Sequence, residues 1–136
     1  MTKALTKLLA VPALLAAGAQ ALTWITDIPV DAYYEVGTEF VLEWEPEDTP
    51  ETFNLTLSTF LSNPILINPI PWSGPMYDFK DITIVLDDSA KLSDGSYTWV
   101  VDTVDGRTGD DYYYSFMAQY GYSGSSPRSF HVNITS

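Results

Sequence analysis

The chain of 136 residues contains no cysteine. Disulfide bonds, thiolate metal sites and thiol catalysis are therefore excluded, and a folded domain must be stable through packing alone. Only one histidine is present, His131. A two-histidine metal site is excluded, and a serine–histidine–aspartate triad would depend on this residue alone. Side-chain alternation predicts that His131 faces outward from the last strand as an ordinary surface residue.

Basic residues are scarce, with six Lys and Arg against 18 Asp and Glu, a formal net charge of −12. This charge repels phosphate backbones and anionic membrane surfaces, so we expect no nucleic-acid partner. Solubility is the simplest role for so acidic a surface.

Long apolar runs are also missing. A bilayer-spanning helix needs about 20 apolar residues, and no apolar run in the chain is that long. The N-terminus instead has a basic start at Lys3 and Lys7, a short apolar core over residues 8–17, and the small-x-small triplet Ala19-Gln20-Ala21. This pattern is typical of a secretory signal peptide. We expect residues 1–21 to be removed and residues 22–136 to be secreted, extracellular or in a cell wall, without a membrane anchor. Four basic and 18 acidic residues then remain, a formal charge of −14.

Apolar and polar side chains alternate in short segments that turn residues separate, a pattern typical of half-buried strands. The segments are residues 24–28, 40–44, 53–57, 82–86, 97–101, 112–116 and 130–134. About seven strands at this spacing predict an all-β fold, an immunoglobulin- or fibronectin-III-like antiparallel β-sandwich, in one monomeric domain. Tyr112, at the start of its strand, is the expected tyrosine corner, whose hydroxyl bonds upstream backbone.

Residues 62–75 do not follow this rhythm, because they contain four prolines and two Asn-Pro steps. Proline fixes its own φ and biases the preceding residue toward extended geometry. We therefore expect a stiff extended loop or an irregular edge strand here, and loops carry function more often than cores do.

Aromatic rings outside the inward phase are candidates for stacking on sugar rings. Trp72, Tyr77, Tyr33 and Tyr34 are the leading candidates for carbohydrate binding. The alternative is that Trp72 and Tyr77 cover an edge of the core. Tyr113, Tyr120 and Tyr122 also lie outside the inward phase.

Two sequons, Asn54-Leu55-Thr56 and Asn133-Ile134-Thr135, predict N-glycosylation at Asn54 and Asn133. Both asparagines fall on the outward phase of their strands, as a glycan requires.

Catalysis and metal binding have little support. Two carboxylates suffice for a glycosidase, but among 18 acids such a pair arises by chance, so we expect no enzyme. Calcium is conceivable where turn aspartates converge, yet no EF-hand spacing is present, and solvated turn residues, without metal or cofactor, are the preferred interpretation. These aspartates are Asp87, Asp88, Asp102, Asp105, Asp110 and Asp111.

A fixed order of strand and turn signals runs through the chain: Ile28-Pro29, Val36-Gly37, residues 40–44, Phe53 with Leu55 and Leu57, residues 95–99, residues 109–112, Ser126-Pro127 and residues 130–132. This order resembles the N-terminal domain of fungal yeast cell-wall-synthesis (KRE/KNH-like) proteins. The resemblance implies a secreted or cell-surface β-sandwich linked to the assembly of β-1,6-glucan. It implies no catalytic residues.

The leading hypothesis is a secreted, non-enzymatic fungal cell-wall protein that binds or organises β-glucan. The alternative is a secreted interaction module or effector that engages a wall or host protein through the proline-rich loop of residues 63–75.

Overall fold

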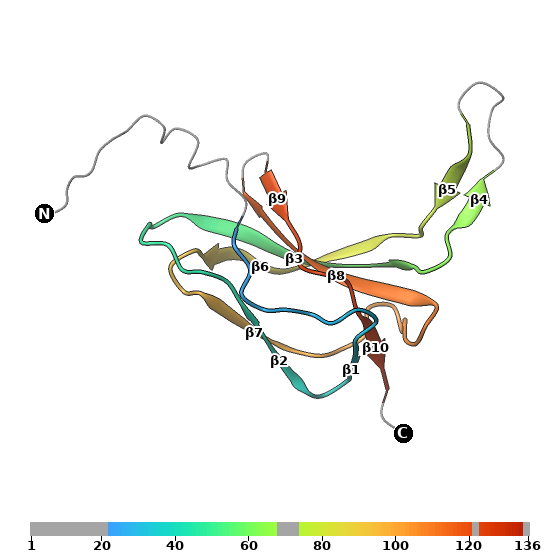
Figure 1. Ribbon diagram of the computed structural model, residues 1–136, viewed down its shortest axis with the longest axis horizontal. Coiled ribbons are helices and arrows are strands. Elements are labelled where there is room, and N and C mark those ends of the chain that lie inside the picture. Colours follow the sequence, from blue (N-terminus) through green and yellow to red (C-terminus); the bar gives the residue numbers. More distant parts are fainter. Residues whose placement is uncertain (1–21, 68–73, 121–122, 135–136) are drawn as a thin grey trace, which may run out of the picture.

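The computed structural model describes residues 22–67, 74–120 and 123–134. The expected signal peptide and Trp72 lie outside these ranges. Within them the fold is all-β, without a helix (Figure 1). The ten strands are β1 (Tyr33–Glu35), β2 (Glu39–Glu43), β3 (Thr52–Leu61), β4 (Ile65–Ile67), β5 (Met76–Asp78), β6 (Ile82–Lys91), β7 (Ser96–Val100), β8 (Tyr112–Tyr120), β9 (Ser123–Ser125) and β10 (His131–Asn133). In these ranges there is accordingly no helical segment that could cross a membrane.

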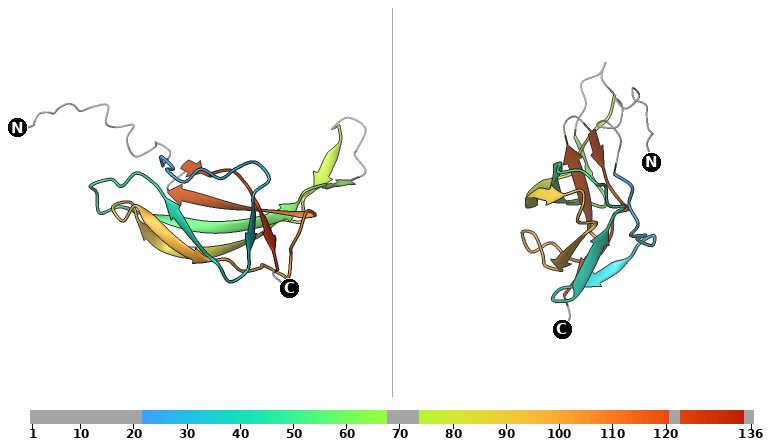
Figure 2. Two further views of the ribbon diagram at one scale, coloured as in Figure 1. Left: turned by 60° about the horizontal axis from the view of Figure 1, so that its bottom comes forward. Right: turned by 90° about the vertical axis from the view of Figure 1, so that its left-hand side faces the viewer.

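The strands form open sheets that pack in layers (Figures 1 and 2). The largest sheet is antiparallel, in the order β6-β3-β8-β9, and the antiparallel pair β2–β7 packs across from it. Phe40 and Trp99, from this pair, contact the ring of Phe116 of β8 at 5.6 and 5.4 Å between centroids. The parallel pair β1–β10 completes the body, and the antiparallel β4–β5 hairpin projects away from it.

Phe130, which is fully buried just before β10, lies at the centre of the core. It forms an antiparallel bridge with Tyr114 that ties the β10 segment to β8 through two backbone hydrogen bonds of 2.8 and 2.9 Å. Five aromatic rings contact the ring of Phe130, those of Tyr34, Phe40, Trp99, Tyr114 and Phe116. Aromatic packing around Phe130 therefore joins the layers, and no disulfide bond contributes because the chain has no cysteine.

Six of the seven expected segments overlap observed strands, namely β2, β3, β6, β7, β8 and β10. The expected first strand, residues 24–28, is wrong, because only an isolated bridge between Trp24 and Trp44 forms there. The hydroxyl of Thr26 explains the interruption, since it accepts the Glu43 N–H at 2.7 Å and donates to the Val41 carbonyl. This side chain takes the place of a backbone ladder partner.

The tyrosine corner also differs from the expectation, because Tyr114 rather than Tyr112 forms it. The Tyr114 side chain is fully buried, and its hydroxyl accepts the Val104 N–H at 2.9 Å and donates to the Arg107 carbonyl at 2.7 Å. Tyr112 is only half-buried, and its ring lies under the Arg107 guanidinium at 5.0 Å. Both tyrosines share one strand face, but only the second lies deep enough to reach the 104–107 turn.

Residues 62–75 were expected to form an extended loop or an irregular edge strand. In the described part of this range, Ile65–Ile67 form the short strand β4, which pairs with β5 from Ile65↔Asp78 to Ile67↔Met76, so the second alternative is closer to the structure. Strands of three residues, such as β1, β4, β5 and β9, are too short to show alternation in a sequence.

Candidate functional site

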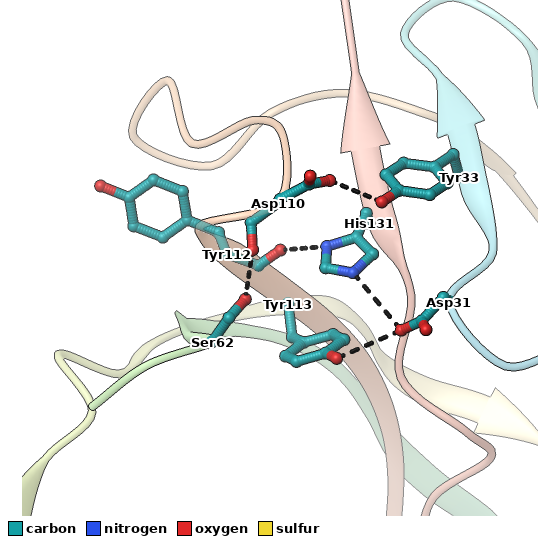
Figure 3. Close-up of polar contacts among 7 residues, drawn as sticks. All are labelled: Asp31, Tyr33, Ser62, Asp110, Tyr112, Tyr113 and His131. Carbon is teal, nitrogen blue, oxygen red and sulfur yellow. Dashed lines mark hydrogen bonds and ion pairs between the residues drawn. The ribbon is translucent and has the colours of Figure 1, made fainter.

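Three rings from distant parts of the chain stack on one another at the edge of the body (Figure 3). The imidazole of His131 lies between two phenol rings, with centroids 4.8 Å from Tyr33 and 4.4 Å from Tyr113. The interplanar angles are 20° and 29°, so the rings are nearly parallel. We call these three residues the ring stack.

Backbone pairing explains why the ring stack forms. The parallel register of β1 and β10 sets Tyr33 beside His131. The bridge between Tyr114 and Phe130 sets the neighbouring residues, Tyr113 and His131, beside each other. Because successive side chains point to opposite faces of a strand, the bridged pair enters the core while their neighbours meet on the other face.

His131 was expected to be an exposed surface residue, and the structure corrects this, because the residue is only 4% exposed. Its side chain does face away from the core, but the two tyrosine rings cover it. Nδ1 lies 2.8 Å from the Tyr112 carbonyl, which can only accept, so Nδ1 carries a hydrogen and donates. Nε2 lies 3.9 Å from the Asp31 carboxylate.

Two carboxylates flank the ring stack, each held by a tyrosine hydroxyl. Tyr33 donates to Asp110 at 2.5 Å, and Tyr113 donates to Asp31 at 3.3 Å. The Asp31 side chain is 64% exposed, which leaves it free to accept further hydrogen bonds. The site thus combines an aromatic surface with acceptors at its rim.

Both carboxylates are placed by turns with left-handed backbone. Asp31 has φ 55° in a turn that the Ala32 N–H closes onto Pro29, and aspartate tolerates this conformation better than most residues. Asp110 follows Gly109, which has φ 81° and whose N–H bonds the Val132 carbonyl at 2.8 Å. A side chain at position 109 would be strained.

The turn that carries Asp110 is also held from the side of the β4–β5 hairpin. The Ser62 hydroxyl donates to the Asp110 carbonyl at 2.6 Å, and the Ser62 N–H bonds the Asp111 carbonyl at 2.9 Å (Figure 3). These bonds fix the turn independently of the Tyr33 hydroxyl, so the rim is preorganised.

The outer ring of the stack is the accessible one. Tyr33 is 46% exposed, although one face of its ring lies on His131. The hydrogen bond to Asp110 raises the pKa of the Tyr33 phenol, since ionisation would place two negative charges together. Tyr33 therefore remains a neutral donor at physiological pH.

The four leading carbohydrate candidates do not form one surface. Tyr33 belongs to the ring stack, whereas Tyr34 points into the core against Phe40 and Phe130, as alternation along β1 requires. Tyr77 is on the projecting hairpin and is 51% exposed. Trp72 lies outside the described residues.

Sequence reasoning missed that Asp31 and Asp110 belong to the same site as Tyr33. For Tyr113, the sequence indicates only an outward orientation. The signal that could have connected them was the pairing of β1 with β10, which is parallel and joins opposite ends of the chain.

The glycosylation sequons lie on strands, and occupancy at both stays a prediction. Asn54 is half-buried on β3, between β6 and β8, and its Oδ1 is buried without a hydrogen-bond partner among the described residues. The strand face that was expected to be open is thus partly covered here. Asn133 is half-buried at the end of β10, opposite Glu35.

The turn aspartates do not gather into a cation site. Over residues 22–67, 74–120 and 123–134, no three His, Cys, Asp or Glu side chains are arranged to hold a metal ion. An open surface depression is lined by Pro46, Glu47, Asp48 and Ser93, none of which belongs to the ring stack or its rim.

The tyrosines predict how stability changes at alkaline pH. Burial raises the pKa of Tyr114, Tyr34 and Tyr120 above 10.0, the ordinary value that applies in the unfolded chain. The folded state therefore holds more protons above this pH, and its stability is complete below about pH 10 and lost as the pH rises through the folded values. We expect a constant urea midpoint from about pH 8 to 9.5 and a steep fall above about pH 10. A midpoint that stayed constant to pH 11 would contradict the burial of these phenols.

No protein-family model matches the chain, and no curated protein or solved structure was found to be significantly similar to it.

Proposed function

We propose that this chain is a secreted, non-enzymatic protein that binds β-glucan at a fungal cell wall through the ring stack. The observation that carries the proposal is the exposed ring of Tyr33, backed by His131 and flanked by Asp31 and Asp110. The signal-peptide pattern of residues 1–21 and the resemblance to yeast cell-wall-synthesis (KRE/KNH-like) proteins support the cellular setting.

The chemistry of the site suits a sugar. A pyranose ring presents axial C–H groups on one face, which pack against an aromatic ring, and hydroxyls at its edge, which donate to carboxylates. Because Tyr33 is held by stacking and by its bond to Asp110, little conformational entropy is lost when a ligand binds. An uncharged polysaccharide is also compatible with a net charge of −12, which would repel an anionic ligand.

A binding role without catalysis is supported by how the only histidine is used. His131 is buried, and its Nδ1–H is bonded to backbone, so the imidazole stabilises the site rather than meeting a substrate. The two carboxylates each accept a tyrosine hydroxyl, which favours a role as hydrogen-bond acceptors for a ligand.

We assign the sandwich to the immunoglobulin type. In such domains strand B pairs with E, strand C pairs with F, and a tyrosine corner lies near the start of F. The pairs β2–β7 and β3–β8, together with Tyr114 on β8, support this assignment.

The proposal is tested by retention of the secreted, deglycosylated protein on insoluble β-1,3- and β-1,6-glucan. We expect Tyr33→Ala to weaken binding at least about tenfold, since it removes the stacking surface. Tyr33→Phe keeps the ring and should bind within about threefold of the parent protein, which separates stacking from the hydroxyl bond.

Tyr77→Ala is the matched control, because Tyr77 is similarly exposed, 51% against 46% for Tyr33, but lies on the hairpin. Unfolding midpoints of all variants show whether the fold is retained. If the parent protein is not retained on either glucan, or if Tyr33→Ala and Tyr77→Ala behave alike, the ring stack is not a glucan site.

A further inference from the structure

The β4–β5 hairpin concentrates exposed apolar side chains as no other described element does. We define the arm as β4, β5 and the adjoining Phe79, which projects from the body (Figure 1). Six of these seven residues are large apolar side chains with exposures between 41% and 58%: Ile65, Leu66, Ile67, Met76, Tyr77 and Phe79. Single exposed apolar residues are ordinary, but a contiguous group marks an interaction site.

The arm is apolar on both of its faces. Residues paired across two strands point to the same side, so Leu66 and Tyr77 share one face while Ile67 and Met76 share the other. A protein that docked on one face would leave the opposite pair in water. An apolar medium around the arm would cover both pairs.

The edges of the arm are poor templates for another strand. Each strand has only three residues, and each follows a proline, Pro64 or Pro75, which lacks an N–H. Short strands and proline are ways in which proteins block edge pairing. Because the strands are short, the arm has few unpaired backbone N–H and C=O groups. A shallow position in a lipid interface tolerates these groups, whereas a deep position does not.

Charge is absent from the arm up to its base. Residues 52–77 contain no Asp, Glu, Lys, Arg or His, although the whole chain has a net charge of −12. The first charged side chains after this stretch, Asp78 and Lys80, form a 2.9 Å ion pair in which their charges neutralise each other. The ammonium group of Lys80 lowers the pKa of Asp78, so this pair persists at neutral pH.

The base of the arm is anchored to the body. The Leu61 N–H bonds the Phe79 carbonyl at 2.9 Å, and the ring of Phe79 meets that of Phe60 edge-on at 6.5 Å. Aromatic side chains at such a position suit the boundary between an apolar medium and water.

We propose that the arm inserts shallowly into the interface of an electrically neutral lipid bilayer and holds the acidic body outside it. A zwitterionic surface is the preferred partner, because anionic lipids would repel the body. The arm shares no residue with the ring stack or its rim.

Flotation of the secreted protein with phosphatidylcholine vesicles tests the proposal. We expect co-flotation, and we expect Leu66→Ser/Tyr77→Ser and Ile67→Ser/Met76→Ser each to lower the partition coefficient at least about tenfold. The control Val85→Ser/Val100→Ser removes two apolar side chains of similar exposure, 58% and 56%, from the body, and should leave partition unchanged.

Lipid charge and salt concentration give a second test. Replacing about a third of the lipid with phosphatidylserine should reduce partition several-fold at low ionic strength, and about 0.5 M salt should restore it, because repulsion is screened while apolar insertion is not. Binding that instead increased with phosphatidylserine would overturn the preference for a neutral surface.

Three results would overturn insertion itself, provided that the unfolding midpoints match. The first is that the parent protein does not float with the vesicles. The second is that only one of the two face variants binds the vesicles more weakly. The third is that the control variant loses as much vesicle binding as the arm variants. Light scattering that showed a dimer lost in both arm variants would identify a second copy as the occupant. If only one of the two face variants lost binding, and the parent protein captured a wall or host protein, the results would favour the interaction module expected from residues 63–75.

Discussion

Replacing Phe130 with alanine is expected to lower the free energy of unfolding by about 3–5 kcal/mol. The side chain is fully buried, and five aromatic rings from the four strands β1, β2, β7 and β8 contact it. Removing it creates a cavity that large neighbouring rings cannot collapse to fill. The loss is a large fraction of the stability of a typical domain, about 5–15 kcal/mol.

Urea unfolding followed by tryptophan fluorescence measures this loss. Phe79→Ala is the matched control, because the same side chain is removed where it is 44% exposed, and a change below about 1 kcal/mol is expected. Similar losses in the two variants would show that Phe130 is not the centre of the core.

Replacing Tyr114 with phenylalanine is expected to cost about 1–3 kcal/mol, although the change removes a single oxygen. The hydroxyl accepts the buried Val104 N–H and donates to the Arg107 carbonyl. Without it, the Val104 amide loses its partner away from water, which costs the desolvation penalty of that group. The 104–107 turn should loosen at the same time.

The matched control is Tyr112→Phe, at the position that the sequence suggested for this role. Its ring packs beside Arg107, so loss of the hydroxyl should change stability by less than about 0.5 kcal/mol. Amide hydrogen exchange at Val104 should accelerate in Tyr114→Phe and stay unchanged in Tyr112→Phe. Equal effects of the two substitutions would refute the assignment of the corner to Tyr114.

The two tyrosines show what side-chain alternation can and cannot predict. It correctly placed Tyr112 and Tyr114 on one strand face, because successive side chains of a strand point to opposite sides. It could not decide which of them meets the 104–107 turn, since that depends on where the chain crosses the end of β8.

For His131, alternation likewise predicts the orientation of the side chain but not its burial. Its outward orientation follows from the buried positions of Phe130 and Val132 on either side. Its burial requires Tyr33 and Tyr113, which are distant in sequence and which the β1–β10 pairing and the bridge from Tyr114 to Phe130 bring to it. Predicting the site would have required knowing that the two ends of the domain pair in parallel.

The sequence by itself determined the all-β class, six of the strands and the apolar rows that form the core, because the period of two is a local property of an extended chain. Tertiary structure alone decided the ring stack with its carboxylate rim, the tyrosine that closes the corner, and the hairpin formed by β4 and β5. Each of these depends on contacts between segments that are far apart or too short to show a period, and the free energy of such contacts is not recorded in any local pattern.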